Sequence, residues 1–589
     1  MKFRLLPLLA LAGWVMAGCD PAEPPVPEVT APDVPQNVVL HGSTENSLTF
    51  QWSVVENASG YDWRLTSTGE DDREGSVAKR NISIDKLTPG TTYLFSVRAV
   101  NSAGKSAYSS ELEAKTQGTV PTPPDPGDES SAVCVDAPVV IKLDSAPVLG
   151  TSGRIRVCKA DGTEVDRIDL ADMATVDVLE DGTMIPKGAD ADAGKIAIGN
   201  DYVFNTFMDA LHSNQYRAVH YTPLRIKGNT LEIKLHNEAL DFGQTYTVKL
   251  DDAVLGRAVE DVTFTTKSKP SGSTVSVNAD GSADFCTVQG AISFVSGNVG
   301  KDDAATIEVA AGTYRELLFM RGKNNVTIKG ASREGTVIAY PNNDSYETGS
   351  GASLSSKPSL GAQIGKSGGR SLFLVETCDN LVLEKLTIEN TYSIASHKGQ
   401  AETIYFNADG KRLTVENCSL ISWQDTFLCK GLVWVHNSLI AGHVDFIWGY
   451  PKACLFENCE IRSRAGGYIV QARINSASDK GFVFLNCNLT AESGVKDGSM
   501  YLARSGGDSS VWDNVTYVNC TMSPAIAPAG WHTSKTPNPS VPTATSGWKE
   551  YGSVTPSGTS ASGVRNAYGR VITADEAAGY MSREAVLGW

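Results

Sequence analysis

The stretch Val415-Glu-Asn-Cys-Ser-Leu420 recurs along the chain with an apolar residue, an Asn, a small residue and a second apolar residue in the same order. The further copies are Val435-His-Asn-Ser-Leu-Ile440, Phe456-Glu-Asn-Cys-Glu-Ile461, Phe484-Leu-Asn-Cys-Asn-Leu489 and Tyr517-Val-Asn-Cys-Thr-Met522. Their asparagines lie 20, 21, 28 and 33 residues apart. A variable period in β-rich sequence is typical of a parallel β-helix whose coils carry loops of different length. The repeat therefore predicts an all-β fold with a parallel β-helix over residues 273–589.

A small residue follows each repeat Asn and is predicted to point into the core of the β-helix. These residues are Cys418, Ser438, Cys459, Cys487 and Cys520. Disulfide bonds are one interpretation, and a ladder of free thiols is the other. Parallel stacked side chains rarely have bridging geometry, so we favour the ladder of buried thiols.

Two carboxylates share one phase of the repeat. Asp425 lies eight residues after Asn417, and Asp445 lies eight residues after Asn437. Equal phase in neighbouring coils places both on one face, about 4.8 Å apart along the sheet. Two carboxyl groups that close do not both ionise freely, so one stays protonated while the other is charged. The pattern predicts an acid beside a nucleophile or base.

Several ordered motifs resemble those of the pectin methylesterases, which are also called pectinesterases. The motifs are Gly312-Thr-Tyr-Arg-Glu316, Gly399-Gln-Ala401, Trp423-Gln-Asp-Thr426, Gly442-His-Val-Asp-Phe-Ile-Trp-Gly449 and Tyr501-Leu-Ala-Arg504. The resemblance covers about residues 273–589 and implies a right-handed parallel β-helix, in agreement with the repeat. It implies hydrolysis of the C6 methyl esters of homogalacturonan to pectate and methanol.

The resemblance also implies a role for each residue that matches a family motif. Asp445 matches the nucleophile, and Asp425 matches the acid that protonates methanol and then acts as a base on water. Gln400 and Gln424 match the amides that stabilise the tetrahedral oxyanion. Arg504 matches the residue that holds the nucleophile and would keep it ionised. The chemistry implied in this way requires no metal and no cofactor.

Further residues near these motifs are predicted to line the substrate cleft, because sugar faces stack on aromatic rings and clefts need a few polar groups. They are Phe446, Trp448, Thr426, Gln471 and Tyr501. By contrast, the segment Gly312 to Glu316 is predicted to be structural.

Two departures from the family pattern concern substrate contacts. Trp448 stands where the family usually has Phe, and Arg504 is followed by Ser505-Gly-Gly-Asp508 instead of the usual Pro-Trp. The missing Trp leaves one sugar platform unfilled unless Trp531 or Trp548 supplies it.

Other functions of the same fold remain as alternatives. A β-helix lyase would need a cation-binding cluster of acids with a basic residue, and a polygalacturonase would show three Asp with a Gly-His-Gly; neither pattern occurs. A noncatalytic, surface-located pectin-binding protein is the remaining alternative. The intact set of predicted catalytic residues favours the esterase.

The N-terminus, residues 1–19, has Lys2 and Arg4 before an apolar run and small residues before Cys19. This layout is that of a secretory signal, and it resembles a bacterial lipoprotein signal whose Cys is lipidated. Met16 departs from the preferred Leu at its position. We expect an exported lipoprotein anchored by Cys19 to the outer membrane, on either the cell-surface or the periplasmic face.

Proline-rich segments divide the rest of the chain. Residues 20–35 are a spacer and 117–131 a linker, with a segment between them (36–116) that resembles a fibronectin type III domain. Residues 132–267 resemble an Ig-like β-sandwich, in which 204–211 is predicted to be helical. The net charge of -16 argues against a nucleic-acid partner, and a monomer that binds pectin is expected. Whether Cys134 and Cys158 form a bridge is left open.

Overall fold

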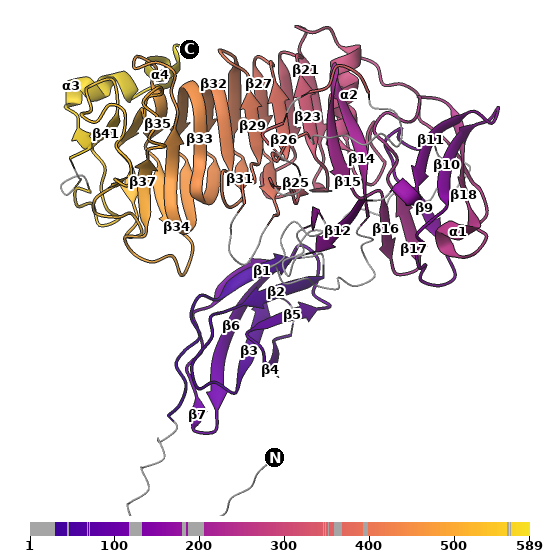
Figure 1. The fold of residues 1–589 in the computed structure, drawn as a ribbon, viewed down its shortest axis with the longest axis horizontal. Coiled ribbons are helices and arrows are strands. Elements are labelled where there is room, and N and C mark those ends of the chain that lie inside the picture. Colours follow the sequence, from indigo (N-terminus) through magenta and orange to yellow (C-terminus); the bar gives the residue numbers. More distant parts are fainter. Residues whose placement is uncertain are drawn as a thin grey trace, which may run out of the picture.

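The computed structural model describes residues 30–43, 46–67, 69, 71–116, 132–172, 174–178, 184–186, 205–344, 347, 349–351, 353–357, 368–392, 399–561, 565 and 567–589. The predicted signal with Cys19 and the linker 117–131 lie outside the described residues. The described residues form three β-rich parts, and the largest of them is a long parallel coil (Figure 1).

The coil is a parallel β-helix built on one 23-stranded sheet in which a strand typically pairs with the strand about three further along the chain. Its strands are β20 (Thr274–Val277), β21 (Ala305–Val309), β22 (Gly312–Tyr314), β23 (Leu318–Arg321), β24 (Val326–Gly330), β25 (Thr336–Tyr340), β26 (Phe373–Glu376), β27 (Leu381–Glu384), β28 (Thr387–Asn390), β29 (Ile404–Asn407), β30 (Arg412–Glu416), β31 (Ser419–Ile421), β32 (Phe427–His436), β33 (Leu439–Glu457), β34 (Glu460–Ala472), β35 (Gly481–Leu485), β36 (Asn488–Ala491), β37 (Met500–Arg504), β38 (Val515–Val518), β39 (Thr521–Met522), β40 (Trp531–His532), β41 (Trp548–Tyr551) and β42 (Gly569–Val571). The predicted fold class is confirmed.

Helices lie near both ends of the β-helix. They are α2 (Val288–Asn298) near its start and α3 (Ala574–Ala577), the 3-10 helix η2 (Ala578–Tyr580) and α4 (Arg583–Leu587) near its finish. Glu316, from the motif predicted to be structural, accepts hydrogen bonds at 2.9 Å from the backbone N–H groups of Val288 and Gln289. A buried carboxylate at this place satisfies N–H groups that the first turn of α2 leaves without helical partners.

The repeat asparagines explain how each coil turns. Asn417, Asn437, Asn458, Asn486 and Asn519 all have φ between 49° and 54°. Asn adopts this left-handed conformation at lower cost than most residues, so the repeat selects it at every turn. The small residue that follows is buried each time, and all the cysteines in this ladder are free, as predicted.

The first part of the chain is a sandwich of two antiparallel sheets. Its strands are β1 (Val39–Ser43), β2 (Ser47–Gln51), β3 (Gly60–Ser67), β4 (Arg73–Val77), β5 (Asn81–Asp85), β6 (Thr92–Asn101), β7 (Gly104–Lys105) and β8 (Leu112–Lys115). Phe50 stacks on Phe95 with ring centroids 3.9 Å apart in its core. The Tyr93 hydroxyl accepts a hydrogen bond from Thr88 N at 2.9 Å, which fixes the turn before β6.

The second part contains two packed sheets and a third sheet that reaches the β-helix. Its elements are β9 (Val139–Lys142), β10 (Arg154–Lys159), β11 (Glu164–Asp169), η1 (Leu170–Asp172), β12 (Ala174–Val178), β13 (Met184–Pro186), β14 (Asn205–Ser213), β15 (Gln215–Tyr221), β16 (Leu224–Lys227), β17 (Thr230–Ile233), β18 (Thr245–Leu250), α1 (Asp252–Leu255) and β19 (Val262–Thr265). The helix predicted at 204–211 is wrong, because β14 pairs with β15 along seven residues. Cys134 and Cys158 are both free.

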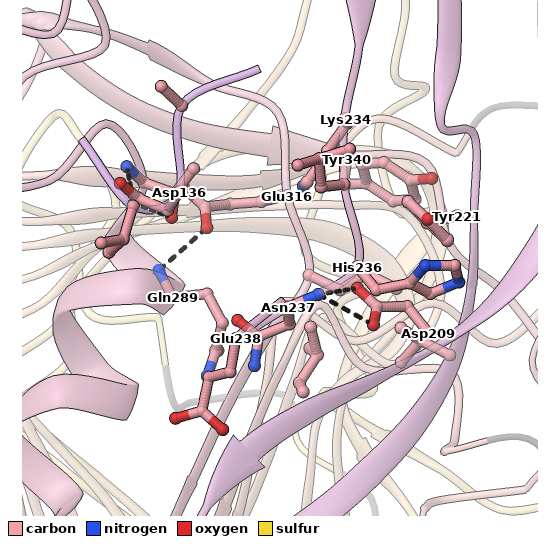
Figure 2. A pocket seen from close by; sticks show the side chains of 17 residues that line it. Asp136, Asp209, Tyr221, Lys234, His236, Asn237, Glu238, Gln289, Glu316 and Tyr340 are labelled. Carbon is pink, nitrogen blue, oxygen red and sulfur yellow. Dashed lines mark hydrogen bonds between the residues drawn. The ribbon is translucent and has the colours of Figure 1, made fainter. Parts of the chain in front are cut away.

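The β14–β15 hairpin joins the second part to the β-helix (Figure 1). Leu211 and Val219 from this hairpin belong to the hydrophobic core of the β-helix. Figure 2 shows a pocket at the same junction, which is lined by Asp209 and Tyr221 of the hairpin and by Glu316 and Tyr340 of the β-helix. None of the predicted catalytic residues lines this pocket.

Candidate active site

Asp445 lies within β33 at a place where the pairing with β34 shifts register. Its carboxylate is 4% exposed and is held by side chains from two later coils. Arg504 Nε donates to both carboxylate oxygens at 2.8 and 3.0 Å, and Arg504 Nη2 donates to Oδ2. Gln471 Nε2 donates to Oδ2 at 3.1 Å. The buried carboxylate is therefore paired with a guanidinium group and an amide, as a buried charge requires.

Asp425 lies in the turn between β31 and β32 and is in phase with Asp445, as the repeat predicts. The register pairs Phe427 with Ile447, two residues beyond each carboxylate. Asp425 N donates to Val444 O at 3.1 Å. Burial raises the pKa of Asp425 well above its ordinary value, and the neighbouring carboxylates Glu402 and Asp445 raise it further. The structure thus places a carboxyl group with a raised pKa beside a carboxylate that Arg504 binds.

Both carboxylates lie on strained backbone. Asp425 has φ 66° and Asp445 has φ 47°. This region costs a non-glycine residue about 1 to 2 kcal/mol, and functional sites are common places for it.

The two predicted amide donors lie together. Gln400 and Gln424 are paired by an isolated parallel β-bridge, and both side chains are half-buried. The Gln424 side chain also hydrogen bonds the Asp425 carboxyl group. Two neutral N–H donors beside the acid are suited to stabilise negative charge that develops on a carbonyl oxygen.

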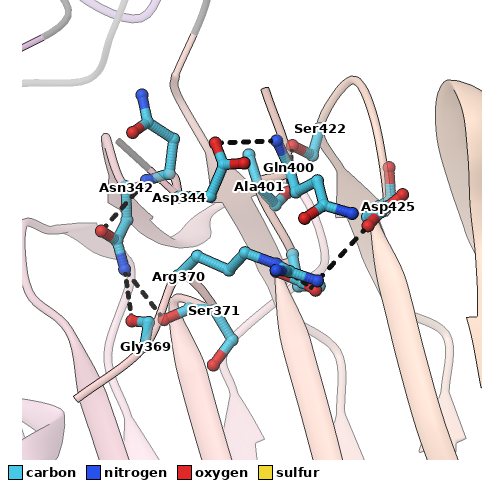
Figure 3. A network of polar contacts seen from close by, with 12 residues as sticks. Asn342, Asp344, Gly369, Arg370, Ser371, Gln400, Ala401, Ser422 and Asp425 are labelled. Atoms are coloured by element: carbon cyan, nitrogen blue, oxygen red, sulfur yellow. Dashed lines mark hydrogen bonds and ion pairs between the residues drawn. The ribbon is translucent and has the colours of Figure 1, made fainter. Parts of the chain in front are cut away.

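A buried ion pair that was not predicted from the sequence lies next to Asp425. Arg370 Nε donates to both Glu402 oxygens at 2.9 and 3.0 Å, while its Nη2 is 3.6 Å from Asp425 Oδ2. Figure 3 shows Arg370 reaching toward Asp425 from the loop before β26, beside Gln400 and Asp344. Arg370 does not lie at the repeat position that Asp425 and Asp445 share. The sequence pattern therefore did not predict its contact with Asp425.

The predicted cleft residues divide into two groups. Phe446 and Thr426 are 0% exposed, and the Thr426 hydroxyl donates to Ala441 O at 2.9 Å, so both are used in packing. Trp448 is 7% exposed, with Arg473 5.0 Å from its ring centroid, and Tyr501 is half-buried. Only Trp448 and Tyr501 among the aromatic candidates have surface to offer a sugar.

Neither Trp531 nor Trp548 replaces the aromatic sugar contact that the usual Trp after Arg504 would make. Both are 1% exposed and stack on one another in the core, with centroids 5.3 Å apart. Three half-buried rings cluster beside Arg504 instead. His532 meets Tyr468 and Tyr501 edge-on at 4.7 and 4.8 Å, and Arg504 lies 4.8 Å from the Tyr468 ring centroid.

Potential metal ligands come together elsewhere in the described part of the chain. Cys134, Asp136 and Cys286 have ligand atoms within 4.8 Å of one another at the junction with the second part. The Asp136 carboxylate already accepts hydrogen bonds from Cys286 N and from Thr287 N and Oγ1. This group is remote in sequence from the carboxylate pair and contributes no residue to it.

Comparisons with known proteins identify the families of two parts of the chain. The sequence model of the family described as Pectinesterase matches residues 274–588, and that described as Fibronectin type III domain matches residues 33–115. Pectinesterase 31 from Arabidopsis thaliana is 33% identical over 261 residues, which span 44% of this chain and 76% of that protein. Pectinesterase A from Emericella nidulans is 28% identical over 43% of this chain and 72% of its own length. The solved structure of pectin methylesterase PemA from Erwinia chrysanthemi is 22% identical, with a TM-score of 0.43, and the match covers 55% of this chain and 98% of PemA.

Proposed function

The chain belongs to the pectinesterase family of carboxylic ester hydrolases, and on that premise we propose that Asp445 and Asp425 hydrolyse the C6 methyl esters of homogalacturonan. The substrate would bind over the carboxylate pair, with Trp448 and the Tyr468–Tyr501–His532 cluster as its apolar contacts. The observation that carries the proposal is the asymmetric pair: Asp445 is bound by Arg504, whereas burial raises the pKa of Asp425.

In the first half-reaction an Asp445 oxygen attacks the C6 carbonyl carbon. The carbonyl oxygen becomes an oxyanion that Gln400 and Gln424 stabilise, a contribution of about 3 to 4 kcal/mol per donor in comparable acyl-transfer sites. The intermediate collapses as the bond to the methoxy oxygen breaks and Asp425 transfers its proton to that oxygen. Methanol leaves, and the C6 acyl group is bound to Asp445.

In the second half-reaction the charged Asp425 takes a proton from water. The resulting hydroxide attacks the acyl carbon, and the bond to Asp445 breaks. The products are a galacturonate carboxyl group and free Asp445, and Asp425 is protonated again. Each group returns to its starting state without a metal or cofactor.

The test is to incubate the protein with highly methylated pectin, with and without EDTA, and to measure three products. We expect methanol release that EDTA leaves unchanged, with no unsaturated uronide and no new reducing ends. Unsaturated product would identify a lyase, and new reducing ends a polygalacturonase. Binding without any product would favour the noncatalytic pectin-binding alternative.

We also propose that the protein is an exported lipoprotein, anchored through Cys19 at the outer membrane and monomeric. The support is the N-terminal sequence, and no helix among the described residues is long and apolar enough to cross a membrane. Replacement of Cys19 by Ser is expected to move the protein from the membrane fraction to the soluble fraction while the rate of methanol release is retained. Unchanged membrane association of that variant would contradict lipid anchoring.

A further inference from the structure

The buried ion pair of Arg370 and Glu402, next to Asp425, points to a function in setting the pH range in which the enzyme is active. We propose that Glu402 and Arg370 are positioning residues that reserve the catalytic proton for Asp425. This inference rests on the proposed esterase function and adds two residues that do not touch the substrate.

Negatively charged groups outnumber positively charged ones around the carboxylate pair. Three buried carboxyl groups, Asp425, Asp445 and Glu402, share two guanidinium groups, Arg370 and Arg504. A buried cluster with excess negative charge is costly, so one of the three carboxyl groups is expected to keep a proton. Contact geometry decides which one.

Each guanidinium is already engaged by a carboxylate other than Asp425. Arg504 donates to both oxygens of Asp445 at 2.8 and 3.0 Å, and Arg370 Nε contacts both oxygens of Glu402 at 2.9 and 3.0 Å. Asp425 has only the 3.6 Å approach of Arg370 Nη2. Because close charge-assisted contacts stabilise an ionised carboxylate most, the proton is left on Asp425.

Arg370 is held in place from the second part of the chain. Arg217 of β15 is 0% exposed and makes five hydrogen bonds of 2.6–3.1 Å, all to backbone carbonyl groups. Four of these carbonyls belong to residues 368–372, the segment that carries Arg370. Asn342 also donates to the Gly369 and Ser371 carbonyls, as Figure 3 shows. A segment fixed by so many bonds holds the Arg370 guanidinium between Glu402, which binds it, and Asp425, which lies 3.6 Å from it.

The charged groups that act on Asp425 come from several elements. Burial raises its pKa most, Glu402 and Asp445 raise it, and Arg370 and the Gln424 hydrogen bond lower it. Arg504 also interacts with Asp425 electrostatically. Burial raises the pKa of Glu402 as well, Arg370 lowers it, and Asp344 raises it. The buried Arg217 also acts on Glu402 electrostatically. Among these groups Arg370 is the cation that can stabilise an ionised Asp425. Glu402 is the carboxyl group that binds Arg370 instead.

The experiment compares three variants, Glu402→Gln, Arg370→Gln and the double variant, by kcat/KM for methanol release against pH. Activity requires Asp425 to be protonated in the free enzyme, so it falls as pH rises through the pKa of Asp425. Glu402→Gln frees Arg370 to pair with Asp425. We therefore expect the falling limb of the plot of kcat/KM against pH to move about 1 to 3 pH units lower. The double variant removes both charges and should return the limb toward its wild-type position. Arg370→Gln alone should move it higher.

Thermal melting of each variant reports whether it folds. A folded, active Glu402→Gln with the wild-type limb would overturn the inference, and so would a double variant with the same shift as the single one. If Glu402→Gln does not fold, Arg370→Gln carries the test: an upward shift supports the inference and an unchanged limb rejects it. Failure of the wild-type protein to release methanol would instead reject the proposed function itself.

Discussion

Replacement of Asp445 by Asn is expected to reduce kcat for methanol release by at least about 1,000-fold. An amide oxygen is a far weaker nucleophile than a carboxylate, and the amide cannot form the same acyl intermediate. The fold should be retained, because Asn has nearly the same size and accepts the left-handed backbone at φ 47°. Initial rates on highly methylated pectin measure the effect.

The matched control for this variant is Asp409→Asn, the same chemical change at an exposed position in the turn before β30. Asp409 forms an ion pair with Lys430 at 3.6 Å, and a surface ion pair of this kind contributes little to stability. The control is expected to keep wild-type kcat. Full activity of Asp445→Asn would contradict the proposed nucleophile.

Replacement of Asp425 by Asn is expected to lower kcat by about 100- to 10,000-fold, the range for loss of a general acid and base. Asn cannot protonate the departing methanol or take a proton from water. Here too the backbone favours Asn, because residue 425 has φ 66°. Steady-state methanol release is the first measurement.

A second substrate separates the two roles of Asp425. An aryl ester of galacturonate has a phenol leaving group that needs no protonation, so the first half-reaction should survive in Asp425→Asn. Water attack remains slow, and we expect a burst of about one phenol per enzyme followed by slow turnover. Rapid steady turnover of the aryl ester without a burst would show that Asp425 does not act on water.

Much of the site could be predicted from the sequence because it follows the period of the coil. The Asn repeat fixes where each coil turns, and Asp425 and Asp445 lie at the same distance beyond it. Registry between neighbouring coils then brings the two carboxylates together whatever the length of the loops elsewhere. The roles of Gln400, Gln424 and Arg504 came from the resemblance to the pectinesterase family.

The residues that lie out of phase could not be predicted in this way. Phe446 was expected to line the cleft, yet it is buried in the core, because hydrophobic character alone does not tell which side of a bulged strand faces solvent. Gln471 was expected to contact substrate, and it contacts Asp445 directly. The rings beside Arg504 belong to β34, β37 and β40, which only the coil brings side by side.

The parallel β-helix, the paired carboxylates and the family follow from the amino-acid sequence alone. The charged groups that surround those carboxylates follow only from the packing of the chain. Arg217, Arg370 and Glu402 are far apart in the chain, and the first of them comes from another part of the fold. A sequence repeat predicts which residues lie next to each other in neighbouring coils. The charge balance of a buried site depends instead on every side chain that packing brings within a few ångströms.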